Sequence, residues 1–206
     1  MSRMFRVGMT RDFLDSDGNV TVGDVGLELL DRAEGVEWEF LPEDSDELTA
    51  EQIRGYDAVI VVARRVTAAT LEGADRLALV ARFGAGYDTV DVEACNRSGV
   101  LLTTTPDGVR RPVASSFMAF ILALSHNMMA KDRITRAGRW SEQADHIGVG
   151  LTGRVLGLVG LGNIGRDVAA LARPWEMRHI AYDPYVSRAD AAAVGVELVD
   201  LETLMS

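Results

Sequence analysis

The run Gly160-Leu161-Gly162-Asn163-Ile164-Gly165 is the segment whose residue types and spacing point most directly to chemistry. It follows the apolar segment Val155 to Val159 and precedes apolar residues at helical spacing. In such a strand–loop–helix unit the first glycine permits a tight turn, the second lets the backbone approach a pyrophosphate, and the third allows close packing. A helix N-terminus also offers free N–H groups and a positive dipole to phosphate. We therefore predict a dinucleotide-binding loop with contacts from Gly160, Gly162, Asn163, Ile164 and Gly165.

An acidic residue in the right place supports this prediction. Residues 179–182 are expected to form the next strand, and Asp183 follows it, 18 residues beyond Gly165. An acid at this position accepts hydrogen bonds from the ribose hydroxyls of the cofactor and repels a 2′-phosphate. NAD is therefore favoured over NADP as cofactor, although Arg188, five residues further on, would weaken that preference. The alternative is a glycine-rich turn that binds no ligand.

The first half of the chain supplies the elements of a separate α/β domain. Short apolar or alternating segments predict strands, and the segments between them predict short helices, at residues 23–32 and 48–54. The run Ala58 to Val62 is continuously apolar, which is typical of a strand buried on both faces of a parallel sheet. The expected strands are 5–9, 36–41, 58–62, 77–83 and 100–103. Strands alternating with helices indicate an open α/β domain that ends near Thr105.

A cluster of turn-forming residues, Thr105-Pro106-Asp107-Gly108, is the predicted boundary between two domains. A single long helix is expected after it, from Pro112 in the first turn to Ala137, with Gly138 ending it. From Val113 to Leu124 this segment is apolar nearly all round, so we expect it to be buried between layers or at a subunit interface.

The composition is that of a globular chain, with 48% hydrophobic and 25% charged residues. The single cysteine, Cys95, excludes a disulfide within the chain, and no signal peptide or membrane-spanning run is visible, so a cytoplasmic protein is expected. Residues 1–105 hold 10 basic and 20 acidic residues, whereas residues 106–206 hold 11 of each. Nucleic acid is therefore an improbable partner for the first half, and neither a membrane nor a metal is predicted to bind.

Four segments, taken together, resemble the D-isomer-specific 2-hydroxyacid dehydrogenases, and the likeness extends from about Ala58 onward. They are residues 82–91 (RFGAGYDTVD), 104–109 (TTPDGV), 151–157 (LTGRVLG) and 181–185 (AYDPY). The resemblance implies an α/β fold: a flavodoxin-like substrate domain over residues 1–105, then an incomplete Rossmann dinucleotide-binding domain over residues 106–206. It also implies that the long helix is an interdomain helix.

The resemblance also assigns a substrate loop. It implies that Gly84, Ala85 and Gly86 offer backbone N–H groups to the carboxylate of a substrate. Asp88 and Asp91 resemble a helix N-terminus that would favour an anion through its dipole. Arg64 and Arg82 follow or end predicted buried strands and are candidates to neutralise a carboxylate or phosphate. An ordinary strand-to-helix turn, with structural or surface arginines, is the alternative.

The chain departs from the family pattern in two places. Many members have a Glu-His pair after the Val-Ala of the long helix, where this chain has Ser115-Ser116. The family's catalytic arginine, glutamate and histidine are expected beyond Ser206, so no catalytic residue is assigned within this chain. We expect a chain truncated at its C-terminus that is inactive alone, with His126, His146 and His179 structural or on the surface.

The function that the resemblance implies is hydride transfer between NAD and a small 2-hydroxy or 2-keto acid, of the glyoxylate, hydroxypyruvate or 3-phosphoglycerate class. A homodimer is expected when the protein is full length. One alternative is a non-catalytic regulatory protein that senses NAD or dimerises on the same scaffold. Another is a formate or phosphite dehydrogenase, which shares this scaffold. The residues present do not identify the acid.

Overall fold

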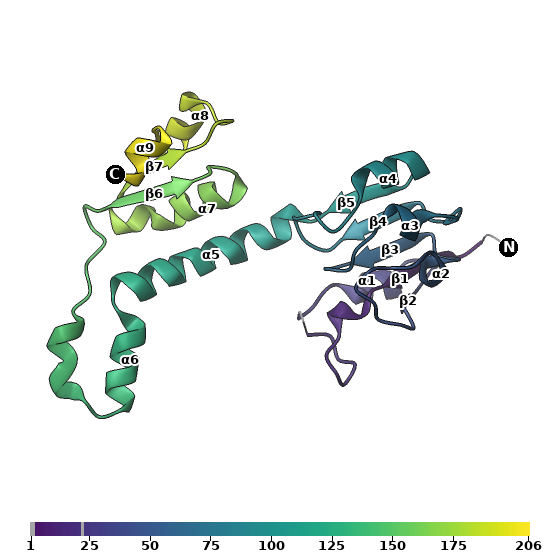
Figure 1. Ribbon diagram of the computed structural model, residues 1–206, viewed down its shortest axis with the longest axis horizontal. Helices are drawn as coiled ribbons and strands as arrows, with labels where there is room; N and C mark the ends of the chain where they lie inside the picture. The colour runs from purple at the N-terminus through teal and green to yellow at the C-terminus, as the bar shows by residue number, and fades with distance from the viewer. Residues whose placement is uncertain (1–2, 22) are drawn as a thin grey trace. The chain divides into compact units, whose positions relative to one another are not determined.

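The computed structural model describes residues 3–21 and 23–206 (Figure 1). The chain divides into two compact units, Met1–Pro106 and Asp107–Ser206, which are treated separately below. Each of the three hydrophobic clusters draws its residues from one unit, one cluster from the first and two from the second. Each unit therefore has its own core.

The first unit contains a five-stranded parallel sheet whose strand order is β2-β1-β3-β4-β5. This is the flavodoxin-like order, which confirms the predicted fold of this part of the chain. The strands are β1 (Phe5–Met9), β2 (Val36–Phe40), β3 (Ala58–Val61), β4 (Leu79–Arg82) and β5 (Leu101–Thr104). Val59 and Val61 of the central strand β3 are buried, as the continuous apolar run predicts.

The helices of the first unit are short. They are α1 (Leu27–Asp31), α2 (Ala50–Ile53), α3 (Ala68–Leu71) and α4 (Val92–Ser98), with a 3₁₀ turn, η1, at Arg11–Phe13. The expected helix over residues 23–32 was too long, because α1 begins only at Leu27. Gly23 and Gly26 have φ angles of 78° and 76°, a left-handed conformation that keeps the chain out of a helix until Leu27.

The parallel register brings the ends of three strands to one edge of the first sheet. Arg82 at the end of β4 lies beside Val61 of β3 and Thr104 of β5. Because parallel strands all point the same way, the residues that follow each strand meet at this edge. The segment after β4, with Gly84, consequently lies next to Thr105, which follows β5.

The second unit contains a three-stranded parallel sheet in the order β6-β7-β8. The strands are β6 (Val155–Val159), β7 (Arg178–Tyr182) and β8 (Glu197–Leu198). Within residues 3–21 and 23–206, no strand pairs with the outer side of β6. Val159 of β6 is accordingly 70% exposed, although its side chain is apolar.

The second unit also contains helices and 3₁₀ turns. They are α5 (Pro106–Ser125), α6 (Met128–Arg136), η2 (Trp140–His146), α7 (Asn163–Ala172), η3 (Arg173–Trp175), α8 (Arg188–Ala193) and α9 (Leu201–Met205). The predicted strand–loop–helix order of residues 155–172 is confirmed. Figure 1 shows α7 running beside β6, the strand from which it follows.

The single long helix predicted from Pro112 to Ala137 is wrong at its start and in its middle. Helix α5 begins at Pro106, so the predicted turn is a helix start, which both proline and an acidic residue favour. Pro112 lies inside α5 instead of in its first turn. The helix then breaks at Asn127, whose φ of 52° is left-handed, and α6 continues at an angle of 63°. Asparagine tolerates this conformation better than most residues.

Only one face of α5 is buried. Ala114 and Met118 pack against β6 and α7, whereas Phe120 is 67% exposed and Phe117 and Leu124 are also exposed. Within the described residues the segment is therefore not buried between layers on all sides, and its place at a subunit interface stays a prediction. No single described helix is long and apolar enough to cross a membrane; α5 and α6 reach that length only as a bent pair.

A buried acid links several segments at the amino ends of the strands of the first sheet. Asp57, only 8% exposed, precedes β3 and accepts a hydrogen bond from the Arg6 backbone N–H at 2.7 Å. Arg76 Nε donates to Asp57 Oδ1 at 2.9 Å, and Arg3 pairs with the same oxygen at 3.1 Å. The hydrogen bonds from Arg76, with the N–H of Arg6 and the two guanidinium charges, lower the pKa of Asp57 to about 2.

Replacing Asp57 with Asn should lower the free energy of unfolding of the first unit at pH 7 by about 2 kcal/mol. The lowered pKa means that the carboxylate stabilises the fold above its ordinary pKa of 3.8 and loses that effect as the pH falls toward about 2. The difference between wild type and D57N should therefore narrow over that range. Urea unfolding followed by circular dichroism between pH 2 and pH 7 measures it. An unchanged midpoint at pH 7 would show that the ion cluster contributes nothing.

Candidate functional site

The glycine loop of the second unit has a backbone that only glycine fits at two of its positions. Gly160, at the end of β6, has a φ of 95°, which turns the chain sharply. Gly165 lies against the carbonyl oxygen of Gly160, and a Cβ added there would collide with it. This contact lets α7 begin directly beside the strand end. The local geometry agrees with the turn and close-packing roles predicted for these two glycines.

The first turn of α7 has the properties of an anion site. Gly162 is its N-cap, and no side chain caps the helix. Among the described residues, none accepts a hydrogen bond from the N–H groups of Asn163 and Ile164. A Cβ built on Gly162 has no atom within 4 Å, so open space lies against the backbone there. Unsatisfied N–H groups, a positive helix end and open space suit a pyrophosphate.

Asp183 lies beside this loop, as predicted, and also holds it in place. One carboxylate oxygen, Oδ2, accepts the Leu161 N–H at 2.8 Å, and Oδ1 accepts the Tyr185 N–H at 2.8 Å. These backbone hydrogen bonds, that of Leu161 first, lower the pKa of the carboxyl group. Asp183 is therefore charged at neutral pH. Its predicted contact with the ribose hydroxyls stays a prediction, but its bond to Leu161 was not anticipated from the sequence.

Arg166 is a second residue at the loop that the sequence reading missed. Its Nε donates to the Leu161 carbonyl oxygen at 3.1 Å. The backbone of Leu161 is therefore held at its N–H by Asp183 and at its carbonyl oxygen by Arg166. The signal for it was weak, because an arginine in the first turns of a helix is ordinarily a surface residue. Its charge also contributes to the lowered pKa of Asp183.

A groove of about 640 Å³ runs along the loop within the second unit. The glycine loop forms one end, the exposed side of β6 contributes Leu158 and Val159, and α5 contributes Phe117 and Ile121. Its side chains are almost all apolar, and Asn163 is the only polar one. No titratable side chain is among the described residues that line it. The groove therefore offers an apolar surface but no acid–base group.

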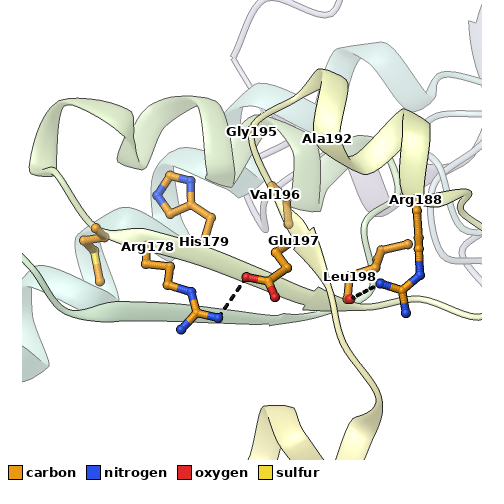
Figure 2. Close-up of a pocket in the computed structure, with 9 residues that line it drawn as sticks. Arg178, His179, Arg188, Ala192, Gly195, Val196, Glu197 and Leu198 are labelled. Atoms are coloured by element: carbon orange, nitrogen blue, oxygen red, sulfur yellow. Dashed lines mark hydrogen bonds and ion pairs between the residues drawn. The ribbon is translucent and has the colours of Figure 1, made fainter.

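The second unit has another cavity, of about 500 Å³, which is lined by residues of β7, β8 and α8 (Figure 2). Its charged groups are engaged: Arg178 pairs with Glu197 at 2.8 Å, and Arg188 donates to the Leu198 carbonyl oxygen at 3.3 Å. His179 lies in its wall but is only 7% exposed, and burial, with the charge of Arg173, lowers its pKa. This histidine is therefore a neutral interior residue, and Arg188 is held toward β8.

The substrate loop predicted from resemblance lies at the carboxyl edge of the first sheet. Gly84 has a φ of 137° and is bonded at both ends of its backbone to one residue. Its N–H donates to Thr105 Oγ1 at 2.8 Å, and its carbonyl oxygen accepts the Thr105 N–H at 2.8 Å. No described group accepts a hydrogen bond from Ala85 or Gly86 N–H. The three residues are brought together as expected, but only these last two N–H groups are available to a ligand.

The two arginines proposed for substrate binding are both engaged within the first unit. Arg82 folds back to donate to the Phe83 carbonyl oxygen and lies directly against Gly84. Arg64 pairs with Asp44 at 2.8 Å, with Asp46 at 3.2 Å and, more distantly, with Asp12. Three carboxylates already surround the Arg64 charge, which disfavours a role in anion binding. Arg82 lies beside the substrate loop, so its position agrees with the predicted role in neutralising an anion there.

The two acids that follow the substrate loop, Asp88 and Asp91, have different contacts. Asp91 is the N-cap of α4, and its Oδ1 accepts the Ala94 N–H at 2.8 Å, which confirms the predicted helix start. The Asp88 carboxylate lies beside Gly86.

Over residues 3–21 and 23–206, no cluster of three His, Cys, Asp or Glu side chains could hold a metal ion.

Comparison with known proteins matches the chain to two family models. The catalytic domain of D-isomer specific 2-hydroxyacid dehydrogenase matches residues 16–146, and the NAD binding domain of the same family matches residues 118–206. The D-3-phosphoglycerate dehydrogenase of Archaeoglobus fulgidus is 32% identical over 176 residues, which are 85% of this chain and 33% of that protein. The enzyme of the same name from Homo sapiens is 35% identical over 77% of this chain and 30% of its own length.

Solved structures show the same architecture. A protein of Thermus thermophilus superposes with a TM-score of 0.78 at 27% identity, covering 97% of this chain and 61% of that one. The D-lactate dehydrogenase of Escherichia coli superposes with a TM-score of 0.72 at 24% identity, covering 98% of this chain and 62% of that one. The chain thus spans about a third of the curated relatives and about three-fifths of these structures.

The bond from Leu161 to Asp183 should be visible as protection of one amide. In D183A the Leu161 amide should exchange with solvent at least about tenfold faster than in wild type, because its acceptor is gone. In D183N the protection should persist, since the side-chain amide oxygen can still accept. Hydrogen exchange followed by NMR on the ¹⁵N-labelled chain measures both.

Asp200 supplies a matched control, because it caps α9 through the Thr203 N–H at 2.7 Å. D200A should change exchange at Thr203 and leave Leu161 unaffected. Equal protection of Leu161 in wild type and D183A would show that Asp183 does not anchor the loop.

Proposed function

The chain belongs to the D-isomer specific 2-hydroxyacid dehydrogenase family, and from this premise we propose that it carries two binding half-sites of such an enzyme. The second unit is the NAD-binding part, and the first unit takes the carboxylate of a small 2-hydroxy or 2-keto acid. The reaction of the whole protein would be oxidation or reduction at the carbon that bears the hydroxyl or keto group. The proposed acid is of the glyoxylate, hydroxypyruvate or 3-phosphoglycerate class.

The observation that carries the proposal is the conformation of the Gly160–Gly165 loop. The turn at Gly160, the packing of Gly165 and the free N–H groups of Asn163 and Ile164 together form a site for a pyrophosphate. Asp183 is charged and lies beside the loop, where a 2′-phosphate would meet a negative charge. The same acid is an acceptor for unmodified ribose hydroxyls, which supports NAD over NADP.

The first unit supports the substrate part of the proposal. Ala85 and Gly86 present N–H groups at the carboxyl edge of a parallel sheet, the edge where open α/β sheets bind ligands. Arg82 lies against Gly84, the residue that precedes them, and adds a positive charge. When bound, NAD supplies or accepts the hydride. The residues of this chain bind and orient the two reactants, and the groove along β6 offers an apolar wall beside the glycine loop.

Replacing Gly162 with Ala should weaken NADH binding to the 206-residue chain at least about tenfold. The added methyl group projects into the open space where the backbone approaches the pyrophosphate. The apo fold should keep its stability within about 1 kcal/mol, because the φ of −73° suits alanine and only the helix cap is affected. Titration of NADH fluorescence, with thermal unfolding of the apo proteins, measures both quantities.

Gly150, before β6 and outside the groove, provides a matched glycine. A methyl group built there has no atom within 4 Å, so G150A should bind NADH as wild type does. NADPH should bind wild type at least about tenfold more weakly than NADH. Unchanged NADH affinity in G162A would contradict the placement of the pyrophosphate, and preference for NADPH would contradict the role of Asp183.

We also propose that the 206-residue chain binds cofactor without catalysing turnover. The described lining of the groove holds no titratable side chain, and His179 is buried and lines the other cavity of this unit. A steady-state assay with NADH and glyoxylate, hydroxypyruvate or pyruvate should therefore show no consumption above the buffer rate. Robust NADH consumption would mean that this chain holds an acid–base residue after all.

A further inference from the structure

Thr105 contacts the backbone of the substrate loop without being part of it. It follows β5, the neighbour of β4, and immediately precedes Pro106, where α5 begins. In the sequence it is the first residue of the turn-forming cluster Thr105-Pro106-Asp107-Gly108. In the structure it makes both hydrogen bonds to the backbone of Gly84.

The two bonds differ in what they depend on. The bond from Thr105 N–H to the Gly84 carbonyl oxygen uses only the backbone and continues the alignment of β4 and β5. The bond from Gly84 N–H to Thr105 Oγ1 needs a hydroxyl group. Serine would preserve this second bond, whereas valine, which has nearly the same shape as threonine, would remove it and leave the Gly84 N–H without a partner.

Fixing Gly84 has a consequence for the next two residues. Gly84 is also confined by the Arg82 side chain against its Cα, in a left-handed conformation that other residues avoid. With Gly84 held on three sides, the N–H groups of Ala85 and Gly86 point in directions set by its orientation. Two successive free N–H groups held in place are a suitable receptor for a carboxylate.

We propose that Thr105 is a positioning residue for substrate: its hydroxyl fixes Gly84 so that the Ala85 and Gly86 N–H groups receive the substrate carboxylate. This inference rests on the proposed function, and it adds a residue and a division of roles within the loop. Gly84 shapes the loop, and the next two residues bind. Because Thr105 adjoins the start of α5, the loop is also coupled to the segment that joins the two units.

The test compares Thr105→Val and Thr105→Ser in the ¹⁵N-labelled 206-residue chain. Pyruvate is titrated as the probe, and the NMR shifts of the Ala85 and Gly86 amides report its binding. We expect about a fivefold or larger loss of affinity in T105V and less than a twofold change in T105S. The Gly84 amide should exchange at least fivefold faster in T105V, with or without pyruvate. Thr103→Val, two residues earlier on β5 and exposed, is the matched control.

Each outcome decides the matter. Loss in T105V with rescue in T105S supports the proposal, whereas equal affinity and equal Gly84 exchange in T105V and wild type overturns it. Equal losses in both variants would assign the effect to packing and overturn the role of the hydroxyl. If wild type does not bind pyruvate at Ala85 and Gly86, the proposed function fails for the substrate and the carboxylate role of Thr105 fails with it. Gly84 exchange then shows separately whether Thr105 orders the loop.

Discussion

The contact between Gly165 and the carbonyl oxygen of Gly160 is the constraint on which the second unit depends. It leaves no room for a side chain, so α7 can begin at the very end of β6. That closeness places the helix N-terminus, with its unsatisfied N–H groups, over the loop and next to Asp183. A longer connection would satisfy those N–H groups with its own carbonyls or with water, and the loop would lose its affinity for anions.

The two units order their loops by the same kind of hydrogen bond. In each, a loop follows a parallel strand, and a polar side chain after the neighbouring strand accepts an N–H from that loop. Asp183, after β7, accepts from Leu161, and Thr105, after β5, accepts from Gly84. Parallel strands make this possible because their carboxyl ends share an edge. Each acceptor leaves the next N–H groups of its loop free, so ordering the loop and exposing its donors are achieved together.

The sequence predicted the strands and the dinucleotide loop, because each depends on local patterns of apolar residues and glycines. The flavodoxin-like order was implied by the family resemblance. The sequence did not predict the break at Asn127, since one residue in a left-handed conformation leaves no mark on helical periodicity. It also missed Arg166 and the second role of Asp183, because both depend on how a side chain reaches the Leu161 peptide. The carboxylates around Arg64 come from segments as distant as Asp12, so the pairing required the fold.

The separate hydrophobic cores of the two units bear on how such a chain can change over generations. A genetic exchange whose junction falls after Pro106 would carry β1 to β5 and Thr105 into the hybrid as one intact piece. The incoming half would bring its own core and its own glycine loop. The two units can therefore be inherited as separate structural modules, each with the residues that shape its own loop.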